Sequence, residues 1–315
     1  MIPRYPTFKH LEVGDKAEID AYVRQFPSYS QFSFASLYAY DYSGDTQLSW
    51  LDGNLLLRLQ DFTTMGHFYT FLGTSRVAET IATLLGRARN EGIQAALQIV
   101  PEVCVRSELD DLRQRFTIAE EEACFDYVLD AVELSRMSAS RTSPHRRDIL
   151  RFMQRHPEVA IEEVDLRRQD VQGRLRDLFE AWARAKKKSP DDVAVERKAL
   201  ARTLAIAELL DPITVGAFLG DELVAFTMNE VVPDGYYIGH FGKADPHYRG
   251  LGAFLEQETA KRMLERGCWW MNYEEDLGSP SLRAYKRSFG PVAFLKKFTI
   301  SFKPMRGFYR EVEKI

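Results

Sequence analysis

Long apolar runs are missing from this sequence: no stretch approaches the ~20 residues that a membrane-spanning helix needs. The N-terminal residues MIPRYPTFKH lack the apolar core of a signal peptide. Cysteine is scarce, and Cys104, Cys124 and Cys268 have neither metal-binding nor redox spacing. We therefore expect no transmembrane segment and no disulfide framework, and we expect a protein of the reducing cytoplasm.

Basic residues are in the minority, since 42 Lys and Arg against 46 Asp and Glu give a net charge of −4. This balance argues against a uniformly basic nucleic-acid-binding protein. The charge is uneven, however, because residues 136–188 hold 14 Lys and Arg against 8 Asp and Glu, a local net charge of +6. Exposed charges more than ~10 Å apart are largely screened, so this segment can still form a phosphate-binding face.

The 315 residues, 45% hydrophobic and 28% charged, are typical of a soluble globular protein of about two domains. Periodicity and turn signals predict helices at residues 11–26 and 28–42, a hairpin at 47–59 and a strand at 67–72. A helix at 75–90, a strand at 95–100 and a helix at 105–115 follow, and two closing strands are predicted at 116–123 and 125–129. The second half repeats that order. We therefore predict two copies of one α/β (α+β) architecture, each a mixed sheet flanked by helices, with domains at residues 1–137 and 138–315.

An aromatic stripe lies early in the chain. Its members are Tyr29, Phe32, Phe34, Tyr38, Tyr40 and Tyr42. Such a stripe could stack on nucleic-acid bases, but we interpret it as a short helix packed on the core.

Residues 236–297 organise the second half. An apolar strand (236–241) leads to a turn with two glycines, a helix of about four turns and a second apolar strand (268–271). An acidic loop, residues 274–276, and a helix with several basic residues follow. Strand, glycine-rich turn and helix suit an anionic ligand, because free N–H groups at a helix N-terminus and the missing Cβ of glycine let phosphate approach the backbone.

Two stretches carry a family resemblance. Arg249-Gly-Leu-Gly252 resembles the Arg/Gln-x-x-Gly-x-Gly/Ala loop with which GNAT-superfamily acyl-CoA N-acyltransferases grip pyrophosphate, although Phe254 replaces the last small residue. Met271–Gly278, together with Leu282–Phe289 and Pro291, is similar to the catalytic domain of phosphatidylglycerol lysyltransferases and their stand-alone relatives. That resemblance implies two tandem GNAT-like folds and an aminoacyl-tRNA donor. The full-length membrane lysyltransferases carry a transmembrane portion that this sequence lacks, which weakens a lipid acceptor.

The resemblance implies roles for the acidic loop. Glu275 and Asp276 correspond to acidic residues that line the aminoacyl pocket, where a carboxylate can bind an α-ammonium group or act as general base. The alternative is structural, because Asp276 and Ser279 are both good N-cap residues. Arg283 and Lys286, three residues apart on the next helix, can face a phosphate or simply pair with the loop.

Further donor-binding candidates are Arg249, Gly250, Gly252, Lys243 and Asn272. The family shows His-x-Glu-Lys where this chain has His240 and Lys243, and Gly242 replaces the glutamate. A catalytic role of that glutamate therefore does not carry over, and a histidine that ends an apolar strand is more often structural. Glu196 also matches a recurrent family position, although an isolated helical glutamate is usually solvated.

Arg147, Arg151 and Arg155 recur at every fourth residue, which places them on one face of a helix. This face can bind tRNA phosphate or an anionic headgroup, or it can be an ordinary solvated face. Asp148 stands where the family usually has asparagine.

Neither a Ser-His-Asp arrangement, nor a cysteine nucleophile, nor a metal cluster is evident, so we expect no permanently bound cofactor. Direct attack by an acceptor needs only positioning, a base and a donor for the oxyanion. The preferred hypothesis is an aminoacyltransferase with aminoacyl-tRNA as donor and an amine or hydroxyl of a small molecule, peptide or lipid as acceptor. An acyl-CoA-dependent N-acyltransferase (acetyl-CoA or another acyl-CoA as donor) and a non-catalytic ligand-binding protein remain open, as does peripheral membrane contact.

Overall fold

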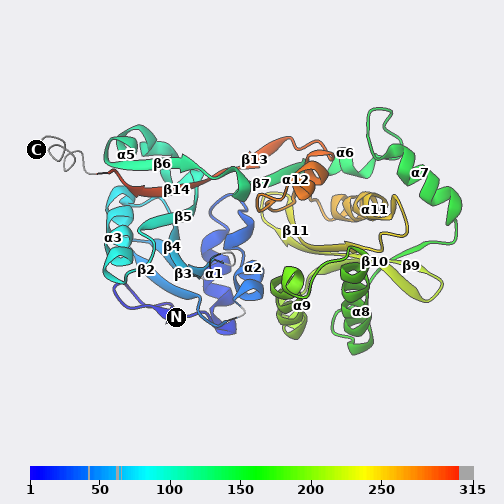
Figure 1. The fold of residues 1–315 in the computed structure, drawn as a ribbon, viewed down its shortest axis with the longest axis horizontal. Coiled ribbons are helices and arrows are strands. Elements are labelled where there is room, and N and C mark those ends of the chain that lie inside the picture. Colours follow the sequence, from blue (N-terminus) through cyan, green and yellow to red (C-terminus); the bar gives the residue numbers. More distant parts are fainter. Residues whose placement is uncertain (42, 62–63, 65, 305–315) are drawn as a thin grey trace, which may run out of the picture. The chain divides into compact units, whose positions relative to one another are not determined.

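Two compact units make up the described chain in this computed structural model (Figure 1). The structure describes residues 1–41, 43–61, 64 and 66–304. The large unit contains Met1–Ile2, His10–Thr46 and Glu122–Lys296. The small unit contains Pro3–Lys9, Gln47–Glu121 and, of the described chain, 297–304. The domain boundary between residues 137 and 138 stays a prediction.

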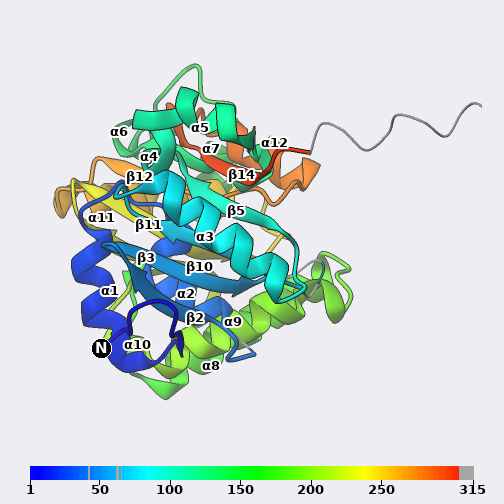
Figure 2. The ribbon, with the colours of Figure 1, turned by 90° about the vertical axis from the view of Figure 1, so that its left-hand side faces the viewer.

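The described strands of the small unit form a mixed sheet in the order β1-β2-β3-β4-β5-β14-β6. They are β1 (Lys9–His10), β2 (Gln47–Leu51), β3 (Asn54–Gln60), β4 (His67–Leu72), β5 (Ala96–Pro101), β6 (Phe116–Glu120) and β14 (Lys297–Phe302). Helix α3 (Val77–Asn90) covers one face of this sheet (Figure 2). The helix predicted over residues 105–115 is divided between α4 (Glu102–Val105) and α5 (Leu109–Arg115).

The described strands of the large unit form a second mixed sheet in the order β13-β7-β12-β11-β10-β9-β8. They are β7 (Asp126–Asp130), β8 (Ala160–Glu163), β9 (Ile213–Leu219), β10 (Glu222–Val232), β11 (Tyr236–Ala244), β12 (Trp270–Asn272) and β13 (Ala293–Leu295). Its helices are α1 (Lys16–Val23), α2 (Phe34–Tyr40), α6 (Ala131–Ser135), α7 (Arg146–Arg155), α8 (Gln169–Ala185), α9 (Ala194–Ala205), α10 (Ala207–Leu210), α11 (Leu251–Glu265) and α12 (Pro280–Arg287).

Helices cover both faces of the large sheet. On one face α11 packs on β9, β10 and β11, and it also contacts α6 and α7. On the other face α8 packs on β10 and β11, and α9 contacts α8 and α2. Figure 1 shows α11 and α8 on opposite sides of these strands. Each side has its own apolar core, and the fold class predicted from the sequence, mixed sheets flanked by helices, is confirmed.

One strand assignment was wrong. Residues 125–129 were expected to close the first sheet, but β7 pairs antiparallel with β12 and β13 in the large sheet. The place between β5 and β6 is taken by β14, which comes from the far end of the described chain. Apolar periodicity marks a strand but carries no information about its partner, so this exchange was hidden from the sequence.

The aromatic stripe belongs to the core, as predicted. Tyr29, Phe32 and Phe34 are buried, and Tyr40 is half-buried. Tyr42 lies outside the described residues.

Candidate active site

A β-bulge in the large sheet turns two polar side chains of β11, those of His240 and Lys243, onto one face. Asn229 of β10 pairs with Gly239 and Met228 pairs with Phe241, so the register skips His240. Residues four apart in a regular strand share a face, yet Tyr237 lies in the core beneath α11 and Phe241 in the core beneath α8 and α9. The extra residue of the bulge explains the switch.

His240 holds two carboxylates together. Its Nε2 lies 2.9 Å from Glu230 Oε2, and its Nδ1 lies 3.1 Å from Glu274 Oε1. Burial alone would lower the pKa of His240, but the hydrogen bonds with Glu230 and Glu274 outweigh it and raise the pKa to about 10. The imidazole is therefore a cation at neutral pH and organises the carboxylates rather than accepting a proton.

Lys243 emerges on the same face. Its Nζ lies 2.5 Å from Glu196 Oε1 of α9 and 4.4 Å from the centre of the Trp182 ring. The glutamate that looked merely solvated in the sequence is thus a specific partner of a predicted donor-binding residue.

Three carboxylates act on the hydroxyl of Tyr40. Burial raises the pKa of Tyr40 well above its ordinary value, and the charges of Glu274, Glu196 and Glu275 raise it further. We call Glu196, Glu274 and Glu275 the acidic cluster. Carboxylates gathered at a half-buried site can bind a cationic ligand group, and here Glu274 and Glu196 also pair with His240 and Lys243.

Asn272 fixes the start of the acidic loop. Its side-chain amide donates to the Ser28 carbonyl at 2.6 Å and to Asp126 Oδ2 at 3.0 Å, while its Oδ1 accepts the Glu274 amide at 2.8 Å. The residue is fully buried. This predicted donor-binding residue therefore positions Glu274.

Asp276 is a buried ion-pair partner in this structure. Its oxygens accept from Arg283 Nε at 2.8 Å, Arg283 Nη2 at 3.0 Å, the Tyr127 hydroxyl at 2.6 Å and the Gly278 amide at 2.8 Å. Burial alone would raise the pKa of Asp276, but the hydrogen bonds from Arg283 and Tyr127 hold it below its usual value. Ser279, the other capping candidate, is the N-cap of α12. Of the two readings for Arg283, the pairing with the acidic loop is the one observed.

Lys286 ties the same loop from the other side. Its buried ammonium donates to the backbone carbonyls of Tyr273 and of Glu275, the latter at 2.7 Å. Burial lowers the pKa of Lys286, and the charges of Glu274 and Glu275 oppose that effect. Lys286 thus holds the backbone of the residues that we predicted to contact an aminoacyl group.

The glycine turn that resembles a pyrophosphate-binding loop packs against α7. Gly250 is the N-cap of α11 with φ +94°, and a Cβ there would come within 2.3 Å of the Asp148 carbonyl oxygen. The Arg249 guanidinium pairs with the Asp148 carboxylate. Phe254 points into the core, where its ring centre lies 5.5 Å from that of Phe152.

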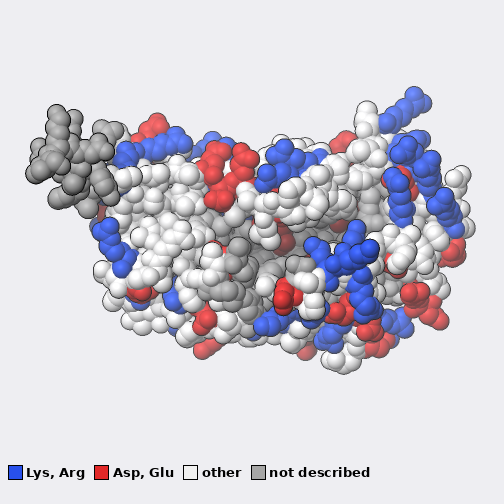
Figure 3. All heavy atoms as spheres, in the orientation of Figure 1, with Lys and Arg blue, Asp and Glu red and all other residues white. Residues whose placement is uncertain are grey.

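The arginine face of α7 is as the spacing predicted. Arg147, Arg151 and Arg155 are all exposed, and within the described residues their side chains make no ion pair. Figure 3 shows Lys and Arg side chains gathered over α7.

Sequence reasoning missed Glu230 and Glu256, and it placed Tyr40 only in the aromatic stripe. Glu256 offered a signal, since it lies one turn before Ala260 on the apolar side of α11. Its Oε1 accepts a 2.9 Å hydrogen bond from the Tyr273 hydroxyl.

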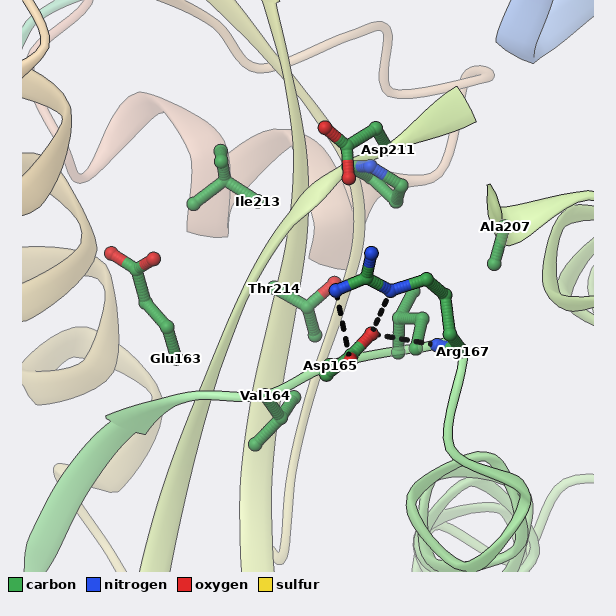
Figure 4. A pocket seen from close by; sticks show the side chains of 10 residues that line it. Glu163, Val164, Asp165, Arg167, Ala207, Asp211, Ile213 and Thr214 are labelled. Carbon is green, nitrogen blue, oxygen red and sulfur yellow. Dashed lines mark hydrogen bonds and ion pairs between the residues drawn. The ribbon is translucent and has the colours of Figure 1, made fainter. Parts of the chain in front are cut away.

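A shallow pocket of about 220 Å³ lies apart from these residues, where β8 is followed by Asp165 and Arg167 (Figure 4). The two side chains form an exposed ion pair at 2.8 Å. The pocket contains none of the predicted site residues. Among the residues described, no cluster of His, Cys, Asp and Glu is suited to a metal ion. In the same part of the chain, every helix is too short or too polar to cross a bilayer.

The family model described as phosphatidylglycerol lysyltransferase, C-terminal, matches residues 24–301. The chain belongs to this family. The resemblance identified from residues 271–291 is thereby confirmed, and membership relates the chain to transferases.

Solved structures agree. A conserved protein of unknown function from Bacteroides thetaiotaomicron is 25% identical, with a TM-score of 0.82 over 96% of this chain and 100% of the other. L-PGS from Bacillus licheniformis is 13% identical, with a TM-score of 0.59 over 98% of this chain and 95% of the other. The C-terminal domain of a candidate lysylphosphatidylglycerol synthetase from Agrobacterium fabrum is 13% identical, with a TM-score of 0.60 over 91% of each chain. The last two share the fold, and no curated protein matches the sequence.

Proposed function

We propose that this chain transfers an aminoacyl group from an aminoacyl-tRNA to an amine or hydroxyl acceptor. The acidic cluster is the observation that supports this proposal best. Its three carboxylates all raise the pKa of Tyr40, which places their charges around one half-buried hydroxyl. An aminoacyl ester carries an α-ammonium group that such a site binds, whereas the acetyl group of acetyl-CoA carries no charge.

In this proposal Glu275, together with Glu274, holds the ammonium group. Asp276 acts behind them, because its oxygens accept hydrogen bonds from Arg283 and Tyr127 and thereby fix the loop. Asn272 and Lys286 fix the same loop at its start and from α12, and Lys243 positions Glu196.

The nucleic acid meets two further groups. The turn of Arg249, Gly250 and Gly252 lies at the N-terminus of α11 and would take the ribose-phosphate end of the donor. The exposed face of Arg147, Arg151 and Arg155 would bind the phosphates of the acceptor stem.

Retention of radiolabelled aminoacyl-tRNAs tests the donor class. A total tRNA pool is charged with all amino acids, and binding is measured over a salt series against the uncharged pool. We expect selective retention of one charged species, which also names the amino acid. No retention of any charged tRNA at low salt, together with a rise in melting temperature on adding acetyl-CoA, would overturn the proposal in favour of an acyl-CoA donor.

The Glu275→Gln variant tests the pocket. Glutamine keeps the shape of the side chain but removes its charge, so selectivity for charged over uncharged tRNA should fall at least tenfold, equivalent to about 1.4 kcal/mol. Binding of uncharged tRNA should stay unchanged. Asp165→Asn is the matched control, because it removes an exposed carboxylate of the same unit, paired with Arg167 and away from the acidic cluster. Equal selectivity in the Glu275 variant and wild type would show that this carboxylate does not hold the donor.

A further inference from the structure

The face of α11 that packs on β11 carries a buried polar group, Glu256, that the function proposed above does not use. Glu256 is 6% exposed, and only its Oε1 is satisfied, by the Tyr273 hydroxyl. Its Oε2 is buried and has no hydrogen-bond partner in the described part of the chain, and the same holds for the Tyr237 hydroxyl. Such an unsatisfied group costs about 1–3 kcal/mol, more when charged. A carboxylate kept in this state points to a role for its proton or for a polar ligand atom.

The pairing between β11 and β12 ends before β11 reaches this carboxylate. β11 and β12 pair in parallel over Tyr236–Ile238 and Trp270–Asn272. After these pairs, Gly242 of β11 lies beside Glu256. A Cβ on Gly242 would lie 3.6 Å from Glu256 Oε1. The glutamate that the family resemblance leads us to expect at position 242 is missing, and a carboxylate from α11 lies against that position instead.

Two tyrosine hydroxyls lie near Glu256, and one of them also lies beside the glycine turn. The Tyr273 hydroxyl interacts with that of Tyr285, which is 40% exposed. A Cβ on Gly252 would lie 3.4 Å from the Tyr285 hydroxyl oxygen. Gly252 and Glu256 are four residues apart on α11 and share one helix face. The Tyr285 hydroxyl therefore lies at the glycine turn, where we place the end of the donor.

We propose that Glu256 is the proton acceptor of the transfer, acting through Tyr273 and Tyr285. This inference rests on the proposed function and adds the base that it lacks. As the acceptor nitrogen or oxygen bonds to the aminoacyl carbonyl carbon, its proton passes to Tyr285. Tyr285 passes its own proton to Tyr273, and Tyr273 passes its proton to Glu256. When the bond between the carbonyl carbon and the ribose oxygen breaks, the proton returns along the same line to the ribose oxygen, so both tyrosines and Glu256 end as they began.

The protonation equilibrium of Glu256 suits this role. Burial raises the pKa of Glu256 to about 7, while the hydrogen bond from Tyr273 and the charge of Lys286 oppose the rise. The titratable groups that face it are Tyr273 from the loop after β12, Tyr285 and Lys286 from α12, and Tyr237 from β11. A base whose pKa lies near the working pH both takes up and releases a proton readily.

Infrared difference titration of the whole protein tests the inference without any substrate. A buried carboxyl band that titrates near pH 7 should be present in the wild type and absent in Glu256→Gln. In Tyr273→Phe the titration should move to higher pH, because a hydrogen bond that stabilises the carboxylate is lost. If the wild-type band titrates near pH 4, or if the near-neutral band persists in Glu256→Gln, the inference is overturned.

The pH profile of transfer is the second test. The donor is the pooled, radiolabelled aminoacyl-tRNA, and the probes for the acceptor are ethanolamine, glycerol and phosphatidylglycerol vesicles. Wild-type kcat should rise tenfold per pH unit below 7 and level off above it. In Glu256→Gln, kcat should fall about 100-fold and lose this rise, with KM for the charged tRNA unchanged. In Tyr285→Phe the plateau should fall while the midpoint stays near 7.

The outcomes separate the two proposals. If wild type transfers to no probe and retains no charged tRNA, the proposed function fails and the role of Glu256 in it fails with it. If wild type transfers and Glu256→Gln keeps the same pH profile, the role of Glu256 is overturned while the proposed function stands. Melting temperatures show whether the variants fold. If Glu256→Gln does not fold, Tyr273→Phe gives an independent test, because it leaves the carboxylate in place.

Discussion

Arg249 and Asp148 join the turn before α11 to helix α7, with Arg249 Nε 3.0 Å from Asp148 Oδ2. The carbonyl of the same Asp148 occupies the space beside Gly250. Arg249 itself is 72% exposed at its side chain, so the ion pair is readily exchanged for a phosphate. The turn therefore combines a backbone contact that demands glycine with a guanidinium that a polyanion can recruit.

Gly250→Ala should destabilise the large unit strongly. Its φ of +94° costs an L-residue about 1–2 kcal/mol, and a Cβ 2.3 Å from the Asp148 carbonyl oxygen forces the backbone of α7 to move. We expect a total loss of about 3 kcal/mol in the free energy of unfolding, with the steric part comparable to overpacking. Urea unfolding measures it.

Gly267→Ala is the control, because Gly267 also has positive φ, +76°, but a Cβ there meets nothing within 4 Å. It should lose only about 1 kcal/mol. Equal losses in the two variants would mean that α7 does not pack on the turn as described.

Arg283→Ala should lower the free energy of unfolding, because it leaves the buried Asp276 carboxylate without its cation. Breaking a buried pair by removing one partner typically costs ~3–5 kcal/mol, but Arg283 is 34% exposed and solvent screens part of the interaction. We therefore expect a loss at pH 7 that is smaller than for a fully buried pair and larger than for an exposed one. The control is Arg167→Ala, whose pair with Asp165 is exposed and should contribute little to stability.

The pH dependence of that loss checks its origin. The pKa of Asp276 is depressed in the native state, so its stabilisation is present above the ordinary carboxyl pKa, ~3.9, and is lost as pH falls below it. The difference in unfolding free energy between wild type and Arg283→Ala should therefore shrink between about pH 5 and pH 2. A difference that is constant over this range would contradict the ion pair.

His240→Gln gives the opposite pH dependence. The pKa of His240 is raised to about 10 in the native state, against ~6.5 in an unfolded chain. Its stabilisation is therefore complete below ~6.5 and is lost as pH rises through about 10. We expect a loss of about 3 kcal/mol at pH 6, shrinking by pH 10, because Glu230 and Glu274 lose a buried cation. His247→Gln, at an exposed histidine, is the control for urea unfolding at both pH values.

Much of the fold followed from local patterns. The hairpin at Asp52-Gly53 and the one at Gly220-Asp221 were predictable because turn residues between apolar strands fix the register locally. The exchange that places β7 in the second sheet and β14 in the first was not predictable. Pairing between strands distant in the chain depends on the assembled sheet.

The site divides in the same way. Pairing of Arg283 and Lys286 with the acidic loop was one of two interpretations that the sequence left open, and it is the one observed. The pocket role of Glu275 came only from the family resemblance and stays a prediction. The contacts of Glu256 did not, since a buried carboxylate finds its partners through the tertiary fold, here Tyr273 from the loop after β12. The bulge at His240 likewise has no sequence signal, although it decides which face His240 occupies.

The arginine face of α7 should report on tRNA by its salt dependence. Replacing Arg147, Arg151 and Arg155 with glutamine removes three exposed cations. If each meets one phosphate, the slope of log K against log salt concentration should become shallower by about 2–3, while unfolding stays within ~0.5 kcal/mol.

Glutamine replacements at Arg106, Arg113 and Arg115 are the matched control, since these arginines are also exposed but lie in the small unit. They change the net charge equally, so a purely general effect of charge would shift both slopes alike. A change confined to the α7 variant identifies specific phosphate contacts, because counterion release counts only the phosphates that a cation neutralises. An unchanged slope in the α7 variant would leave this face as an ordinary solvated surface and move the search for the tRNA contact to other cations of the large unit.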